Sequence, residues 1–221
     1  MKRKLLSLLP KIVGVAMLAP AVVHAQVVLV PAPAPYREVA PTPRPGHAWH
    51  HGYWRWAHGR YEWLPGGWSP EVVVMPGSAQ LPVAQEPPPP PRVERLSADT
   101  LFPFGRGDIG DIRPSGLQDI AQIAGQLRAS PFGHVEVLGY TDRLGSASAN
   151  LALSQRRANA VREALIQQGV PAEKIRAKGL GSRDPVVQCD TTNADALVRC
   201  LQPNRRVEIV TYVRDDPRWR Q

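Results

Sequence analysis

The chain has 221 residues and a formal net charge of +8 at pH 7. Four cations and no anions lie in residues 1–25, so the remaining chain has a formal charge of only +4. This modest excess suits acidic polymers. No stripe gathers the Lys and Arg residues, and nucleic acid is not a natural partner of an exported protein, which the N-terminal residues below predict, so we expect no nucleic-acid partner.

The first 25 residues have the features of a secretory signal peptide. Residues 2–4 are all basic, residues 12–23 carry no charge, and small residues stand at the −3 and −1 positions of a cleavage site after Ala25. A membrane anchor is the alternative, but it needs about 20 apolar residues, and Lys11 interrupts the run. We therefore expect export with cleavage after Ala25. No cysteine lies near that site, so we expect no lipoprotein anchor.

Two proline-rich tracts, residues 26–45 and 76–91, lie in the N-terminal half of the exported chain. The first contains six prolines, and the second ends in five consecutive ones. Chains of this composition are extended, at about 3.1 Å per residue, and cannot bury a core. We therefore predict that both tracts are semi-rigid linkers that hold the flanking parts apart.

Residues 46–75, between these tracts, hold five of the six tryptophans and a short internal repeat. The pattern Trp-x-x-Gly-x-Trp at 49–54 recurs fourteen residues later, at 63–68. Alternation over 53–56 and 61–63 predicts two short strands that turn at 57–60. An isolated hairpin is marginal in water, so we expect this Trp/His-rich segment to need a partner surface.

The histidines of this segment raise the question of a metal site. No Cys or carboxylate cluster completes a recognisable ligand spacing. A polar and aromatic surface patch is therefore the favoured interpretation, and we expect no metal and no cofactor. Sugar binding by stacked tryptophans stays open as an alternative. The histidines are His47, His50, His51 and His58.

Residues 92–215 have the size of one domain, and residues 216–221 form a tail. Periodicity and turn signals predict four strands, at 92–104, 134–140, 174–179 and 205–213, and three helices, at 114–129, 150–168 and 191–200. The alternation of strands and helices indicates an α+β fold with helices packed on a mixed sheet.

Cys189 and Cys200 are the only cysteines. In an exported protein such a pair favours a disulfide, which here closes a short loop and contributes about 2–3 kcal/mol. A metal site is the alternative, but no second Cys or His pair accompanies the two residues. We therefore expect a structural disulfide.

One arginine of the second predicted helix faces its apolar side. At about 100° per residue, Arg156 falls outside the apolar arc, whereas Arg157 and Asn150 fall inside it. Asp142, at the end of the second predicted strand, lies close to this arc. Because a buried arginine needs a partner, two interpretations stay open: a structural ion pair between Asp142 and Arg157, or an open notch in which Asp142 binds an ammonium and Arg157 a carboxylate.

Three stretches carry a resemblance to a known family: GYTDRLGSASANLALSQRRANAVREALIQQGV, IRAKGLGSRDPV and PNRRVEI. They resemble the OmpA-like C-terminal domain family of Gram-negative envelope proteins over about residues 99–213. The Trp-rich segment before them resembles repeats of exported proteobacterial envelope proteins. We therefore expect its partner surface to belong to another envelope component, such as an outer-membrane protein, or to the chain's own domain. The resemblance implies an OmpA-like βαβαβ sandwich that binds peptidoglycan without a covalent bond. Residues 26–91 are too few for eight strands of about ten residues each, so we expect no OmpA-type barrel.

The family binds the diaminopimelate of the peptidoglycan stem peptide, whose ammonium and carboxylate share one carbon. The Asp of its TD motif and the Arg of its helix motif hold these groups, and they match Asp142 and Arg157. Asn150 and Arg205 match positions near the groove, although a contact at the helix start and support of the strand end are alternative roles. Arg206 should point to the opposite face of the sheet, into solvent.

One departure from the family lies at the end of the first predicted strand. A Phe-Asp-Phe-like segment is usual there, whereas this chain has Phe102-Pro103-Phe104. The contact through that acidic side chain is therefore lost, and we expect backbone contacts at Phe104 and Gly105 to remain.

The resemblance implies a protein of the periplasm, associated with the outer membrane, that tethers this membrane or an envelope complex to the cell wall. The alternative is a periplasmic adaptor or assembly protein whose OmpA-like domain serves protein contacts. We find no nucleophile elbow, zincin helix or phosphate-cradling loop, so we expect no enzymatic activity.

Overall fold

A computed structural model of the protein describes residues 27–71 and 88–214. The predicted signal peptide, most of the second proline-rich tract and the C-terminal tail lie outside these residues. In the part of the chain that is described, no helix combines the length and the apolar character needed to cross a membrane.

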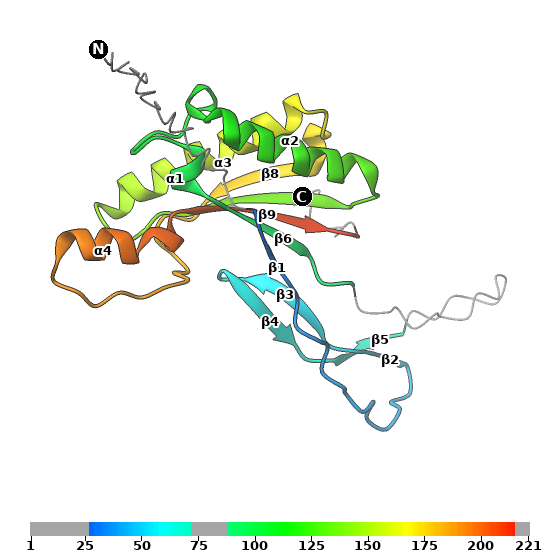
Figure 1. The fold of residues 1–221 in the computed structure, drawn as a ribbon. Helices are drawn as coiled ribbons and strands as arrows, with labels where there is room; N and C mark the ends of the chain where they lie inside the picture. The colour runs from blue at the N-terminus through cyan, green and yellow to red at the C-terminus, as the bar shows by residue number, and fades with distance from the viewer. Residues whose placement is uncertain (1–26, 72–87, 215–221) are drawn as a thin grey trace, which may run out of the picture.

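A five-stranded mixed sheet forms the centre of the fold (Figure 1). The predicted α+β class with a mixed sheet is confirmed, because one pair of neighbouring strands, β7 and β8, is parallel and the other pairs are antiparallel. In order across the sheet, the strands are β1 (Val28–Val30), β6 (Arg92–Ser97), β9 (Arg206–Tyr212), β7 (His134–Gly139) and β8 (Ile175–Gly179).

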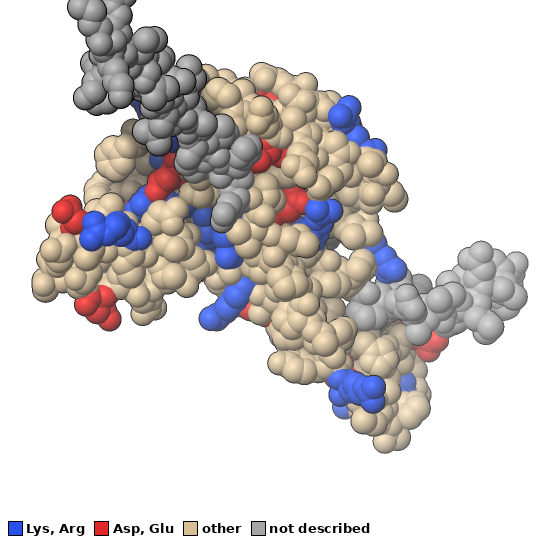
Figure 2. All heavy atoms as spheres, viewed as in Figure 1, with Lys and Arg blue, Asp and Glu red and all other residues tan. Residues whose placement is uncertain are grey.

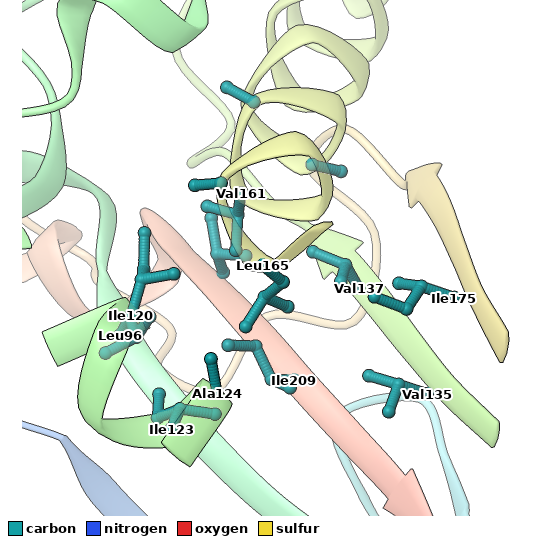
Figure 3. Packing of buried hydrophobic residues seen from close by; sticks show 14 of the residues in the cluster. Leu96, Ile120, Ile123, Ala124, Val135, Val137, Val161, Leu165, Ile175 and Ile209 are labelled. Carbon is teal, nitrogen blue, oxygen red and sulfur yellow. The ribbon is translucent and has the colours of Figure 1, made fainter. Parts of the chain in front are cut away.

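The long helices α2 (Pro114–Ala129) and α3 (Ala147–Gln167) cover one face of this sheet (Figure 1). Their apolar sides meet the sheet in the main core, where Ile120 of α2 and Leu165 of α3 are completely buried (Figure 3). The hydroxyl of Ser146 accepts a hydrogen bond from the backbone N–H of Ala149, so α3 begins three residues before the predicted start. The shorter helices are α4 (Ala194–Cys200), η1 (Ile109–Asp111), η2 (Ala172–Lys174) and η3 (Gln202–Asn204).

The predicted first strand ends earlier than expected. Strand β6 stops at Ser97, and the short helix α1 (Ala98–Leu101) follows it. Leu101 and Phe102 are neighbours in the sequence and are both buried in the main core. A strand would point them to opposite faces, so the chain must turn here to bury both.

The predicted hairpin of the Trp-rich segment is present as β3 (Tyr53–Ala57) and β4 (Arg60–Leu64). A second ladder, β2 (His47–His50) with β5 (Gly67–Pro70), brackets it and was not predicted. The β3–β4 hairpin packs on the sheet face opposite the helices (Figure 1). Trp56 is buried there with Val93 of β6 and Val210 of β9.

Residues 26–45 do more than separate their neighbours, which corrects the prediction of a spacer. They contribute strand β1 to the sheet edge. The ring of Tyr36 packs against Trp54 and Trp63, with centroids 5.2 and 4.9 Å apart. The Glu38 carboxylate accepts hydrogen bonds from the backbone N–H groups of Gly52 (2.7 Å) and Gly66 (2.9 Å), the two glycines of the repeat.

A buried polar cluster joins the hairpin to the sheet. The Glu208 carboxylate is fully buried and accepts hydrogen bonds from Trp56 Nε1 (3.0 Å), Arg95 Nη2 (3.0 Å) and Arg206 Nε (2.8 Å). The prediction that Arg206 is solvated is wrong: it is 1% exposed, and its guanidinium lies 3.7 Å from the centre of the Tyr140 ring. The hairpin covers the sheet face on which Arg206 lies, so this face does not meet water.

Candidate functional site

A cluster of charged side chains lies where the N-terminal end of β9 meets the C-terminal end of β7. The guanidinium of Arg205 joins two carboxylates there. Its Nε and Nη2 donate to Asp99 at 2.9 and 2.7 Å, and its Nη1 donates to Asp142 Oδ2 at 2.8 Å. The hydrogen bond to Asp99 and then that to Asp142 raise the pKa of Arg205. The cluster therefore holds one guanidinium between two carboxylates.

Asp142 follows β7 and is held from two sides. Besides the pair with Arg205, its Oδ1 accepts a hydrogen bond from the backbone N–H of Leu144 at 2.9 Å. Asn150, near the start of α3, donates from Nδ2 to the carbonyls of Asp142 (3.2 Å) and Leu144 (2.9 Å). Asn150 thus fixes the loop that presents the Asp142 carboxylate.

Arg157 of α3 is 3% exposed, as its position on the apolar arc predicts. Its Nε donates to the carbonyl of Arg106 at 2.9 Å, and its guanidinium lies 5.6 Å from the centre of the Phe102 ring. The backbone of Gly107 packs on its stem, where an added Cβ would lie 2.9 Å from Arg157 Cγ. The loop after α1 therefore holds this arginine in place.

The ion pair between Asp142 and Arg157, one of the two interpretations from the sequence, is not formed. Asp142 pairs with Arg205 instead, and the ion pairs of the described residues include none with Arg157. Burial lowers the pKa of Arg157, while the field of Asp99, and to a smaller extent that of Asp142, acts in the opposite direction. The electrostatic fields of Asp99 and Asp142 thus act on the pKa of Arg157, although neither carboxylate forms an ion pair with it.

Phe104 and Gly105 lie at the tip of the loop after α1. The Phe104 side chain is fully exposed, and Gly105 has a φ of +70°, which favours glycine at this turn. Within residues 88–214, neither of them forms a hydrogen bond, ion pair or ring contact with Asp142 or Arg157. The loop instead reaches the charged cluster through the carbonyl of Arg106.

A cavity of about 380 Å³ opens beside Asp142. The disulfide loop closes it on one side, where Cys189 is bonded to Cys200 with their Cα atoms 6.1 Å apart. Arg143 Nη2 donates to the Cys189 carbonyl at 2.8 Å and so ties this loop to the end of β7. Arg157 is not among the lining residues.

Of the residues named from the sequence, the structure joins Asp142, Asn150 and Arg205 by hydrogen bonds and adds Asp99 to them. Arg157 bonds elsewhere, but the fields of Asp99 and Asp142 act on its pKa. Sequence reasoning placed Asp99 inside a strand and missed it. The available signal was a single acidic residue in the apolar stretch that precedes Phe102.

Three of the four histidines of the Trp-rich segment have ordinary partners. His58 Nδ1 lies 2.8 Å from a Glu62 carboxylate oxygen, His50 contacts the Ser69 hydroxyl, and His47 contacts the carbonyl of Pro45. Over residues 27–71 and 88–214, no three His, Cys, Asp or Glu side chains are grouped as a metal site would require. On the face in Figure 2, acidic and basic side chains are interspersed.

Comparison with known proteins identifies similar chains. The model of the OmpA family matches residues 101–199. The chain is 43% identical to outer membrane protein A of Yersinia pseudotuberculosis over 136 residues, which cover 58% of this chain and 38% of that protein. It is 42% identical to outer membrane protein A of Citrobacter freundii over 137 residues, which cover 58% of this chain and 56% of the relative.

Among solved structures, the peptidoglycan-associated lipoprotein from Burkholderia pseudomallei is 30% identical, with a TM-score of 0.43. The match covers 51% of this chain and 87% of that one. The chain thus spans 38% and 56% of the length of the two curated relatives.

Proposed function

We propose that this chain, whose residues 101–199 form an OmpA family domain, binds peptidoglycan non-covalently and tethers the outer membrane or an envelope complex to the cell wall. It recognises the diaminopimelate of the stem peptide and catalyses no reaction on it. Two relatives are named outer membrane protein A, which supports a place in the cell envelope. The protein is exported by its signal peptide and acts in the periplasm, associated with the outer membrane.

The observation that carries this proposal is that the buried Arg157 guanidinium has hydrogen-bond donors left without an acceptor among the described residues. A buried guanidinium is costly unless charges and acceptors face it, yet only its Nε is hydrogen-bonded, to Arg106. Among the described residues, neither Nη atom has a hydrogen-bond partner. A ligand carboxylate that accepts hydrogen bonds from Nη1 and Nη2 would satisfy these two donors and neutralise the buried charge.

We place the ligand between Arg157 and the carboxylates of Asp99 and Asp142, whose field acts on that arginine, and call this position the cleft. The two carboxylates suit the second group of the ligand. Asp99 and Asp142 share one guanidinium, that of Arg205, so this part of the cleft has an excess of one negative charge. Diaminopimelate presents an ammonium and a carboxylate on one carbon. The ammonium matches the acidic part of the cleft, and the carboxylate matches Arg157.

Three further residues support the cleft. Asn150 fixes the loop that carries Asp142, and the turn at Phe104 and Gly105 forms the outer end of the loop that holds Arg157. We assign them to ligand positioning, together with Arg205. An exposed ion pair contributes about 0.2–1 kcal/mol, so one stem peptide binds weakly. The repeating polymer compensates for this through many simultaneous contacts.

Co-sedimentation of the purified protein with peptidoglycan sacculi tests the proposal. Arg157→Gln and Asp142→Asn should remove most of the bound protein. Arg156→Gln is a matched control, because this neighbouring arginine has the same charge but faces water. Circular dichroism checks that each variant is folded. Unchanged sedimentation of a folded Arg157→Gln/Asp142→Asn double variant would refute the site.

A periplasmic adaptor, whose domain serves protein contacts, is the second candidate. It is favoured by one observation: the Phe104 side chain is fully exposed at the tip of the loop after α1, and an exposed aromatic is a common anchor in protein interfaces. Phe104→Ser separates the two functions. It should leave sacculus binding largely intact if Phe104 serves a protein partner, and weaken it if the ring contacts the wall.

A further inference from the structure

A second cavity, of about 450 Å³, lies at the seam between the Trp-rich hairpin and the rest of the fold. Its walls come from four segments: the first proline-rich tract, the β3–β4 hairpin, strand β6 and the loop after β8. Of the described residues, only Pro185 also lines the cavity beside Asp142. Small-molecule sites are commonly about 300–1,000 Å³ in volume and lie preferentially at such junctions. We call this space the seam cavity.

The ionisable groups with a charge of their own at the wall of the seam cavity are basic. Arg60, the first residue of β4, and Arg95 of β6 line it together with His58, and no Asp or Glu is among its described lining residues. The largest of the other lining side chains are the aromatic rings of Trp56 and Tyr61. A ligand that matches these walls has an anionic group and an apolar face.

Positive charge also exceeds negative charge beneath the hairpin. Arg95 and Arg206 share a single carboxylate, that of Glu208, at 3.0 and 2.8 Å. Asp184 donates no charge to this pair directly: its backbone carbonyl accepts from Arg206 at 3.0 Å, and its carboxylate is in no ion pair of the described residues. Because charge buried without a counter-charge is costly, an anion in the seam cavity would be stabilised there.

The free donors of the two lining arginines come from separate side chains. Nε and Nη2 of Arg95 are both bonded to Glu208, and Nη2 also lies 3.5 Å from the carbonyl of Gly59, next to Arg60. Nη1 of Arg95 and both Nη atoms of Arg60 have no hydrogen-bond partner among the described residues; Arg60 Nε lies 3.7 Å from Glu62. A carboxylate is matched best by one complete guanidinium fork, whereas a phosphate has three acceptor oxygens that can meet donors from different side chains.

From this arrangement we propose that the seam cavity binds a phosphorylated sugar. The phosphate meets Arg95 and Arg60, and the ring lies against Trp56 and Tyr61, because the C–H face of a sugar ring packs well on aromatic side chains. Such a group occurs as a free sugar phosphate or as the head group of a membrane glycolipid. The proposal gives the Trp-rich segment a ligand of its own, which does not depend on the binding of peptidoglycan.

NMR shift titration of the full chain with glucose 1-phosphate, glucose and inorganic phosphate tests this proposal. Glucose 1-phosphate should bind more tightly than either of the other two and should shift the indole N–H resonance of Trp56. Arg60→Gln should weaken its binding by roughly twofold to fivefold, the change expected for one exposed ion pair. Arg55→Gln is the matched control, because Arg55 also pairs with Glu62, at 3.5 Å, but is not among the described residues that line the seam cavity. This control should leave the affinity unchanged.

Vesicles of phosphatidylcholine, with and without lipid A, identify the source of the sugar phosphate. Co-sedimentation with the lipid A vesicles alone, reduced by Arg60→Gln, would support the site with a glycolipid head group as its ligand. Binding of glucose 1-phosphate without this co-sedimentation would support it with a free sugar phosphate. The proposal is overturned if glucose 1-phosphate binds no more tightly than glucose or inorganic phosphate, or if Arg55→Gln weakens its binding as much as Arg60→Gln does.

Discussion

The contact of the Trp-rich hairpin with the sheet depends on Trp56. Substitution of Trp56 with Phe keeps an aromatic ring near Tyr61, whose ring centre lies 4.7 Å from that of Trp56, and near Val93 and Val210. It removes the indole N–H that donates to Glu208 at 3.0 Å. A hydrogen bond to a charged group contributes about 1.5–3 kcal/mol.

Glu208 keeps donors from Arg95 and Arg206 in this variant, so we expect a loss near the lower part of that range, about 2 kcal/mol. For a chain of this size about 1 kcal/mol shifts Tm by 2–4 °C, which gives a decrease of about 4–8 °C. Calorimetric unfolding of the full chain at neutral pH measures it.

Trp54→Phe is the control for this experiment. Trp54 lies on the same strand, but its Nε1 donates to a backbone carbonyl, that of Ala34, at 3.1 Å near the surface. A neutral hydrogen bond contributes about 0.5–1.5 kcal/mol, so the loss should be smaller. If Trp56→Phe leaves Tm unchanged, or lowers it no more than Trp54→Phe does, the hairpin is not held to the sheet through Glu208.

Three further predictions concern acid, reduction and catalysis. The backbone N–H groups of Gly66 and Gly52 lower the pKa of Glu38 from 4.5, so its ionised form stabilises the fold; this contribution is present above the ordinary pKa and is lost as pH falls through the lowered one. Tm should therefore fall more steeply on acidification for the wild type than for Glu38→Gln, and parallel Tm profiles would contradict this. Reduction of Cys189 and Cys200 should lower the free energy of unfolding by about 2–3 kcal/mol in urea titrations and leave sacculus binding largely intact; loss of binding by the folded, reduced protein would show that the bridge shapes the site. Incubation with sacculi should release no soluble fragments detectable by chromatography, and released fragments would reveal an enzyme.

Local patterns predicted the elements of the domain and two residues of its cleft. The arc of helix α3 placed Arg157 inside the fold, because helical periodicity decides which side of a helix a residue occupies. The strand end placed Asp142 near it. Neither pattern could identify Arg205 as the partner of Asp142 and Asp99, because Arg205 lies 63 residues from Asp142 and 106 residues from Asp99 in the sequence.

Two predictions, the exposure of Arg206 and the role of residues 26–45, were wrong because each depended on contacts with a distant part of the chain. Alternation along β9 put Arg206 on the second face of the sheet correctly, but it carried no information that a hairpin covers that face. Composition likewise made residues 26–45 a linker, although Glu38 and Tyr36 of this tract contact the Trp-rich segment. Such contacts join distant parts of the chain, and periodicity does not report them.

The central claim is that Arg157 binds a carboxylate of the stem peptide within a cleft that also binds its ammonium. The most direct measurement compares two stem peptides that differ only in the third residue, meso-diaminopimelate or lysine, by calorimetric titration of the full chain. Lysine has the ammonium but lacks the carboxylate, so its peptide should bind the wild type more weakly, and this difference should vanish in Arg157→Gln. Equal binding of both peptides by the wild type would contradict the account.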